Sequence, residues 1–217
     1  MALTQILLTG FAPFGGEKIN PSWQAVQQLD GWQPDAETIV SVLELPCVFG
    51  ESLQILQQAI KEHTPAVVIA VGQAGGRSQF CVEKVAINYD DARIPDNQQQ
   101  QPAGTAIVAD GPTAYFSTLP VKTIVQALQE QGIPAALSFS AGTFVCNHVF
   151  YGMLHRLRNQ PQVKAGFIHI PYSPAQACQH GAVASMELSL VVKALKLCIE
   201  LSLQTNNDVV IAGGTLD

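Results

Sequence analysis

The stretch Phe139-Ser140-Ala141-Gly142-Thr143-Phe144-Val145-Cys146-Asn147-His148 is typical of the end of a buried strand, a sharp turn and the start of a helix. A strand that leads directly into a helix is the repeating unit of α/β folds. The turn places Cys146 in the first turn of the helix, where free N–H groups and the helix macrodipole favour a thiolate. The pattern predicts an α/β protein with Cys146 as a candidate nucleophile, although many free cysteines are simply buried apolar residues.

The rest of the chain repeats this alternation of strand-length apolar runs and segments with helical periodicity. The candidate strands are residues 5–9, 37–45, 66–71, 82–88, 135–140 and 166–170. The candidate helices are residues 22–29, 50–61, 121–131, 145–158 and about 185–203. We therefore expect one catalytic α/β domain over residues 1–217, with a mostly parallel, twisted central sheet flanked by helices in an α/β/α sandwich, as in phosphorylases and hydrolases.

The composition excludes several classes of protein. The chain is 47% hydrophobic with a net charge of −6, and its 11 lysines and arginines are scattered, which argues against nucleic-acid binding. No apolar run approaches the roughly 20 residues of a membrane-spanning helix, and the N-terminus resembles a strand more than a signal peptide. The five cysteines show no C-x-x-C spacing, so we expect reduced thiols, no metal site and a cytoplasmic location.

Ligands of open parallel sheets bind beyond the carboxyl ends of the strands, so the residues that follow each strand are informative. After the first strand, Phe11 and Phe14 lie among glycines and a proline, which suits either the wall of an apolar pocket or a plug at the sheet end. After the third strand, the run 72–77 lacks the G-x-G-x-x-G spacing of dinucleotide sites. It is better suited to presenting Gln73 and Arg77 to a polar ligand.

Two further residues complete a possible catalytic set with Cys146. Glu83 lies in an apolar alternating segment, where an inward-facing acid needs a partner, and His169 lies at the end of the last predicted core strand. A thiol, an imidazole and a carboxylate are the groups that nucleophile, general base and orienting acid require. Each residue also has a structural explanation: Glu83 as a solvated charge and His169 as a core histidine.

Several motifs together resemble the pyroglutamyl peptidase (pyrrolidone carboxyl peptidase) family of cysteine peptidases. The matching residues run in order from about residue 7 to residue 172 and comprise Gly10-Phe11, Pro13-Phe14-Gly15-Gly16, Asn20-Pro21-Ser22, Gly72-Gln73-Ala74-Gly75-Gly76-Arg77, Glu83, Ala86-Ile87-Asn88, Asp90-Asp91-Ala92-Arg93-Ile94-Pro95-Asp96-Asn97, residues 141–148 and His169-Ile170-Pro171-Tyr172. Family members usually have an acidic residue at the position of Ala12. The glutamine-rich run at residues 98–101 falls in a region that varies in the family, and its polarity predicts an exposed, mobile loop.

The resemblance implies hydrolysis of an N-terminal pyroglutamyl residue from peptides, without metal or cofactor, in a cytosolic homotetramer. It places the nucleophile on Cys146, the general base on His169 and the orienting acid on Glu83. It also places a conserved arginine of the oxyanion region on Arg93, near Gln73. The walls around the pyrrolidone ring fall on Phe11, Phe14, Phe144 and Val145.

This substrate agrees with the chemistry of the candidate residues. A pyroglutamyl group has no free amine, so its flat lactam needs apolar walls and one or two hydrogen bonds, which the phenylalanines and Gln73 can supply. The N–H of Cys146, aided by Arg93, is the expected donor set for the oxyanion.

Two other classes remain open on sequence alone. A nucleoside phosphorylase of similar α/β fold would require phosphate and would resist thiol alkylation. A non-catalytic binder of blocked peptide N-termini would bind the substrate and release no product. Comparing iodoacetamide sensitivity with phosphate dependence separates these classes from a cysteine peptidase.

Overall fold

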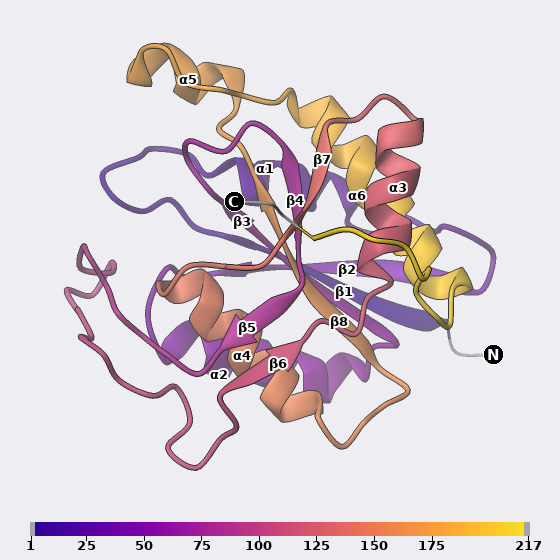
Figure 1. The fold of residues 1–217 in the computed structure, drawn as a ribbon, viewed down its shortest axis with the longest axis horizontal. Coiled ribbons are helices and arrows are strands. Elements are labelled where there is room, and N and C mark those ends of the chain that lie inside the picture. Colours follow the sequence, from indigo (N-terminus) through magenta and orange to yellow (C-terminus); the bar gives the residue numbers. More distant parts are fainter. Residues whose placement is uncertain (1–2, 215–217) are drawn as a thin grey trace.

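A computed structural model describes residues 3–214, and in this range a central sheet of six strands runs through the molecule (Figure 1). The strands lie in the order β2-β1-β3-β8-β4-β7. Their bounds are β1 Thr4–Phe11, β2 Thr38–Leu45, β3 Val67–Gln73, β4 Phe80–Glu83, β7 Ala135–Ser138 and β8 Lys164–Ile170. The first four strands in this order are parallel, whereas β4 is antiparallel to β8 and parallel to β7. The predicted mostly parallel sheet is thus confirmed.

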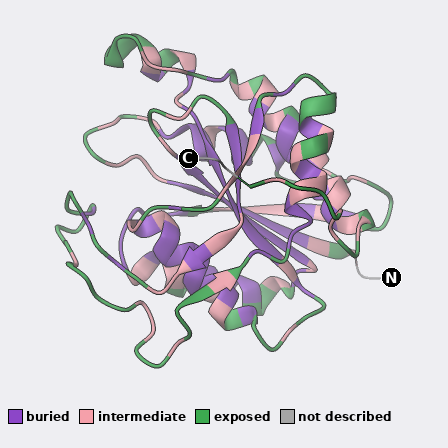
Figure 2. Ribbon diagram, viewed as in Figure 1, coloured by how far each residue is buried: buried purple, intermediate pink, exposed green. Residues whose placement is uncertain are grey.

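Helices cover both faces of this sheet and leave its strands buried (Figures 1 and 2). On one face lie α1 (Pro21–Val26), α3 (Val121–Glu130) and α6 (Leu188–Gln204), with the short 3-10 helix η1 (Gln27–Leu29) after α1. On the other face lie α2 (Glu51–His63) and α4 (Val145–Leu157), which pack against each other. The α/β/α sandwich predicted from the sequence is therefore present.

Strand periodicity decides which residues face which layer of helices. On β8, Ile168 and Ile170 join the apolar cluster that contains α3 and α6, whereas Phe167 joins the cluster that contains α2 and α4. Because successive side chains on a strand point to opposite faces, His169 lies on the same face as Phe167. The β8 histidine therefore points toward the layer that contains α4.

The structure differs from the predicted elements at residues 82–88 and in two elements that were not predicted, β6 (Ala114–Phe116) and α5 (Pro174–His180). The single strand expected at residues 82–88 is divided: β4 ends at Glu83, and β5 (Val85–Ile87) pairs instead with β6 in a separate two-stranded sheet. The backbone leaves the main sheet at Lys84, whose N–H donates to the Ser138 carbonyl and whose own carbonyl accepts from Ser117. The short helix α5 projects from the body in Figure 1. A capping box between Ser173 and Gln176 begins it.

Candidate active site

The centre of the site is a buried histidine on β8 that is hydrogen-bonded to a buried acid on β4. His169 Nδ1 lies 2.8 Å from Glu83 Oε1, and the two residues are 4% and 0% exposed. Within residues 3–214, no protein group bonds the second nitrogen, Nε2, of His169. The carboxylate therefore fixes the Nδ1–H tautomer and leaves Nε2 able to accept a proton.

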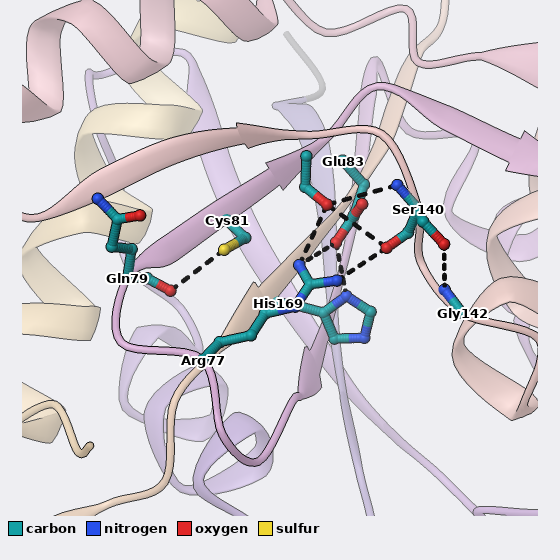
Figure 3. A network of polar contacts seen from close by, with 8 residues as sticks. Arg77, Gln79, Cys81, Glu83, Ser140, Gly142 and His169 are labelled. Carbon is teal, nitrogen blue, oxygen red and sulfur yellow. Dashed lines mark hydrogen bonds and ion pairs between the residues drawn. The ribbon is translucent and has the colours of Figure 1, made fainter. Parts of the chain in front are cut away.

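The pairing of β4 with β8 places the Glu83 side chain next to His169 on the same face of the sheet. In the antiparallel register, Cys81 pairs with His169 and Glu83 pairs with Phe167, so the carboxylate reaches His169 from deeper in the sheet. The same carboxylate oxygen accepts a hydrogen bond from Arg77 Nη1 at 2.7 Å (Figure 3). The sequence suggested that Arg77 would meet a ligand, but its side chain binds Glu83 instead.

Cys146 enters the site from α4. Phe144 is the N-cap residue of α4 in extended conformation, so Cys146 is the second residue of the helix, as the sequence predicts. Within residues 3–214, no protein acceptor bonds the N–H of Cys146, which is one of the four free N–H groups at a helix start.

Gly72 on β3 makes room for the thiol. It pairs with His169 across the β3–β8 register, and a Cβ built on it would lie 2.8 Å from Cys146 Sγ and 2.9 Å from the Phe167 ring. The sulfur thus occupies the space above the backbone that neighbours His169. The structure brings Cys146, His169 and Glu83 together on one face of the sheet.

Burial controls the protonation of these groups. It raises the pKa of the Cys146 thiol above its ordinary value; the Glu83 charge acts in the same direction, and the Arg77 charge opposes both. Burial lowers the pKa of His169, although its hydrogen bond and charge interaction with Glu83 oppose this effect. Burial of the sulfur thus opposes the thiolate that the helix start was expected to favour. The arrangement suits a neutral thiol beside a neutral imidazole, in which the imidazole acts as general base.

Aromatic side chains gather at the start of α4, around Phe144. Phe14, from the loop after β1, lies against Phe144, with ring centroids 6.1 Å apart. Phe49, which sequence reasoning missed, meets Phe144 edge-on at 5.3 Å. Phe14 and Phe144 are half-buried, whereas Phe11 and Val145 are fully buried, with Phe11 packed on Phe167.

The loop that carries Phe11 and Phe14 is fixed by the Asn20-Pro21-Ser22 motif. Ser22 Oγ accepts from the Phe11 N–H, and Asn20 Nδ2 donates to the Ala12 carbonyl at 3.1 Å. The loop is thus held through its backbone, with alanine at position 12.

The two predicted polar contacts differ in their surroundings. Gln73 is buried at the end of β3, and its Oε1 accepts from Gln176 Nε2 of α5 at 3.0 Å. Arg93 is exposed, and its side chain forms no hydrogen bond within the described part of the chain. Its loop is tied to the residue before Phe144, since the Asp91 N–H donates to the Thr143 carbonyl at 2.9 Å. Arg93 therefore lies on a loop that borders the start of α4.

The glutamine-rich loop is exposed, as predicted, but hydrogen bonds attach it to the body of the protein. Asp96 is buried and accepts from the N–H groups of Phe49, Gln98 and Gln100. Gln98 Nε2 donates to Glu51 at the start of α2. The signal that could have indicated this attachment is Asp96 itself, because aspartates commonly organise turns by accepting N–H groups from the residues that follow.

The geometry defines a class of protein: an α/β protein with a buried His-Glu pair beside a half-buried cysteine has the groups of a cysteine hydrolase. Within the described part of the chain, no helix is long and apolar enough to cross a membrane.

Comparisons with known proteins identify the family. The family model described as pyroglutamyl peptidase matches residues 4–205, so the chain belongs to the pyroglutamyl peptidase family of cysteine peptidases. A pyrrolidone-carboxylate peptidase from Enterobacter sp. (strain 638) is 55% identical over 212 residues, covering 98% of this chain and 99% of that protein. One from Yersinia pestis (strain Pestoides F) is 51% identical over 215 residues, covering 99% of this chain and 100% of that protein.

Solved structures agree with this result. The crystal structure of pyroglutamyl peptidase I from Bacillus amyloliquefaciens has a TM-score of 0.93 at 46% identity and covers 97% of this chain and 100% of that one. A mutant pyrrolidone carboxyl peptidase from the hyperthermophile Pyrococcus furiosus has a TM-score of 0.89 at 42% identity and covers 93% and 99%. The resemblance noted in the sequence is confirmed over nearly the whole chain.

Proposed function

We propose that this protein hydrolyses the N-terminal pyroglutamyl residue from peptides with Cys146 as nucleophile, His169 as general base and Glu83 as the acid that orients His169. The observation that carries the proposal is the open Nε2 of His169, on a ring fixed by Glu83 at 2.8 Å, next to the glycine above which the Cys146 sulfur lies. The family membership of the chain supports the same chemistry.

The reaction follows from these groups. His169 Nε2 takes the proton of the Cys146 thiol as the sulfur attacks the pyroglutamyl carbonyl. The imidazolium then returns the proton to the departing amine, and a thioester remains on Cys146. Water, activated by the neutral imidazole, hydrolyses the thioester and releases pyroglutamate.

The pocket residues support this substrate. Phe14 and Phe144 are the accessible aromatic groups for the flat faces of a lactam, and the buried Phe11 and Val145 act from beneath by fixing the shape of the pocket. The side-chain carbonyl oxygen of Gln73 accepts a hydrogen bond from Gln176. The amide N–H groups of Gln73 are therefore available to the lactam carbonyl. Specificity then comes from the polar groups that the wrong residue would leave unpaired.

The oxyanion that forms during attack requires donors near Cys146. The free N–H of Cys146 is the first donor that we assign. Arg93 is the second, since its loop is joined to Thr143 just before the helix start. Both assignments concern the reacting complex, in which an exposed arginine side chain can turn toward the charge.

Assembly and location remain predictions. Exposed aromatic side chains such as Phe116 on β6 and Phe139 after β7 support contact with further copies of the chain, as in a homotetramer. Sedimentation velocity of the purified protein measures the oligomer directly. The cytoplasmic location agrees with free cysteines within residues 3–214.

The test of the proposed function is the Cys146→Ala variant with a chromogenic pyroglutamyl amide. Activity should fall by at least about 10⁴-fold, since the nucleophile is lost. The circular dichroism spectrum should remain that of the wild type. Iodoacetamide should inactivate the wild type, and phosphate should have no effect on turnover. Full activity in the Cys146→Ala variant would overturn the assignment.

A further inference from the structure

Arg77 lies in the turn between β3 and β4, and its guanidinium connects three segments of the site. Nη1 donates to Glu83 Oε1 at 2.7 Å and to Ser138 Oγ at 3.2 Å. Nη2 donates to the Ser140 carbonyl at 2.8 Å (Figure 3). One side chain thus joins β4, the end of β7 and the turn that leads to Cys146.

The surroundings of Glu83 explain why a cation is required there. Glu83 is 0% exposed, and its second oxygen, Oε2, has no hydrogen-bond partner in the described part of the chain. A neutral imidazole gives the carboxylate a hydrogen bond but no opposite charge. A buried carboxylate is costly without such a charge, and Arg77 supplies it.

We propose that Arg77 is a positioning residue of the active site, which holds the Glu83 carboxylate and the Ser140 turn in the one arrangement that aligns His169 with Cys146. This inference rests on the function proposed above and adds a fourth residue to it. The Arg77 donors are directed at protein acceptors, so the role in ligand binding suggested by the sequence is replaced by a role within the site.

The charges around His169 support this role. Burial lowers the pKa of His169, Glu83 raises it, and the charge of Arg77 lowers it again. The other titratable groups nearby are the thiols of Cys81 on β4, Cys146 on α4 and Cys47 before α2, and burial raises the pKa of all three. These thiols are neutral near pH 7, so Arg77 is the cation that balances Glu83.

The experiment is a pH profile of kcat/KM for the Arg77→Met variant with a chromogenic pyroglutamyl amide. We expect kcat to fall about 10-fold and KM to change less than about 2-fold, because orientation is lost while the pocket stays. The acid limb should move to higher pH by about one unit, because loss of the cation raises the pKa of His169. Arg77→Lys keeps the positive charge, so the acid limb should stay at the wild-type pH. Its kcat should lie between those of Arg77→Met and the wild type, because lysine lacks the paired N–H donors of the guanidinium.

Two comparisons make the result specific. Arg156→Met, on an exposed arginine of α4 beside the amino ends of β1 and β3, is the matched control and should behave as wild type. In a Glu83→Gln background, Arg77→Met should lower kcat by less than about 2-fold, since its partner is already changed. The double variant also contains no unpaired buried carboxylate, so it remains informative if the single variant fails to fold.

The possible failures are distinguishable. Wild-type kcat and an unmoved acid limb in Arg77→Met would overturn the role of Arg77 and leave the proposed function intact. A raised KM with unchanged kcat would overturn it as well, by assigning Arg77 to substrate binding. Activity in Cys146→Ala would instead overturn the proposed function itself.

Discussion

Two buried histidines in this protein have the same kind of partner but different surroundings. His169 Nδ1 lies 2.8 Å from Glu83, and His148 Nδ1 lies 2.7 Å from Asp90. Nε2 of His148 accepts the N–H of Gly50 at 3.1 Å, whereas Nε2 of His169 has no protein partner within residues 3–214. One ring has both nitrogens occupied, and the other has one nitrogen available.

This difference separates the proposed catalytic histidine, His169, from the structural one, His148. Burial and an acid partner are common to both, so neither property identifies the base. Protonation of His148 would break its bond to Gly50, whereas protonation of His169 breaks no bond. His148 instead supports the aromatic cluster at the start of α4, since its ring meets Phe49 edge-on at 5.5 Å and Phe49 meets Phe144.

Replacing each histidine is the most direct test of the contrast between His169 and His148. His169→Ala should lower kcat/KM by about 10³- to 10⁴-fold, because the general base is lost. His148→Leu should lower it by less than about 10-fold, because only the support of the aromatic wall changes. Steady-state kinetics on a chromogenic pyroglutamyl amide measures both, with circular dichroism to check folding. Equal losses in the two variants would mean that the open nitrogen is not what distinguishes them.

The two acids offer the next comparison. Glu83→Gln should lower kcat by about 10²-fold, less than His169→Ala, because orienting a base matters less than supplying it. The acid limb of kcat/KM should also move to lower pH by about one unit, because Glu83 raises the pKa of His169 and its loss leaves the imidazole neutral at lower pH. Asp90→Asn is the matched control and should leave the acid limb in place. A limb that moved equally in both variants would contradict the assignment of His169 as base.

Stability should depend on His148, whose ring has both nitrogens hydrogen-bonded. His148→Leu leaves Asp90 and the Gly50 N–H unpaired in a buried region, so the free energy of unfolding should fall by about 3 kcal/mol. His155→Leu, on the same helix, removes one bond to Tyr115 at a half-buried position and should cost less than about 1 kcal/mol. Urea unfolding followed by circular dichroism gives both values. A negligible change in the free energy of unfolding for His148→Leu would contradict the structural role of His148.

Most of the fold was predictable because hydrophobic periodicity is local information. The strands and helices of the main sandwich fall close to the predicted ranges, and Cys146 lies in the first turn of α4 as expected. The division of residues 82–88 between two sheets was not predictable, because it depends on where Lys84 meets Ser138 and Ser117 from distant segments.

The main residues of the proposed site carry signals in the sequence, whereas the supporting residues do not. Cys146 lies at a helix start, His169 lies near a strand end and Glu83 is an acid in an apolar strand, so each gives a local signal. Arg77 ends the glycine-rich run at residues 72–77, and the sequence therefore predicted that it contacts a ligand. The clue was Glu83, since a fully buried acid requires a charge as well as a hydrogen bond, and an arginine six residues earlier was available.

The space above Gly72 has a consequence for engineering the protein. Because a Cβ at this position would fall 2.8 Å from the Cys146 sulfur, a single methyl group would compete with the nucleophile for the same volume. A Gly72→Ala substitution would act as a built-in inhibitor that leaves every reacting group present and displaces the sulfur, with the Phe167 ring also having to shift. Such a variant could retain bound substrate for crystallography with the thiol, imidazole and carboxylate all intact.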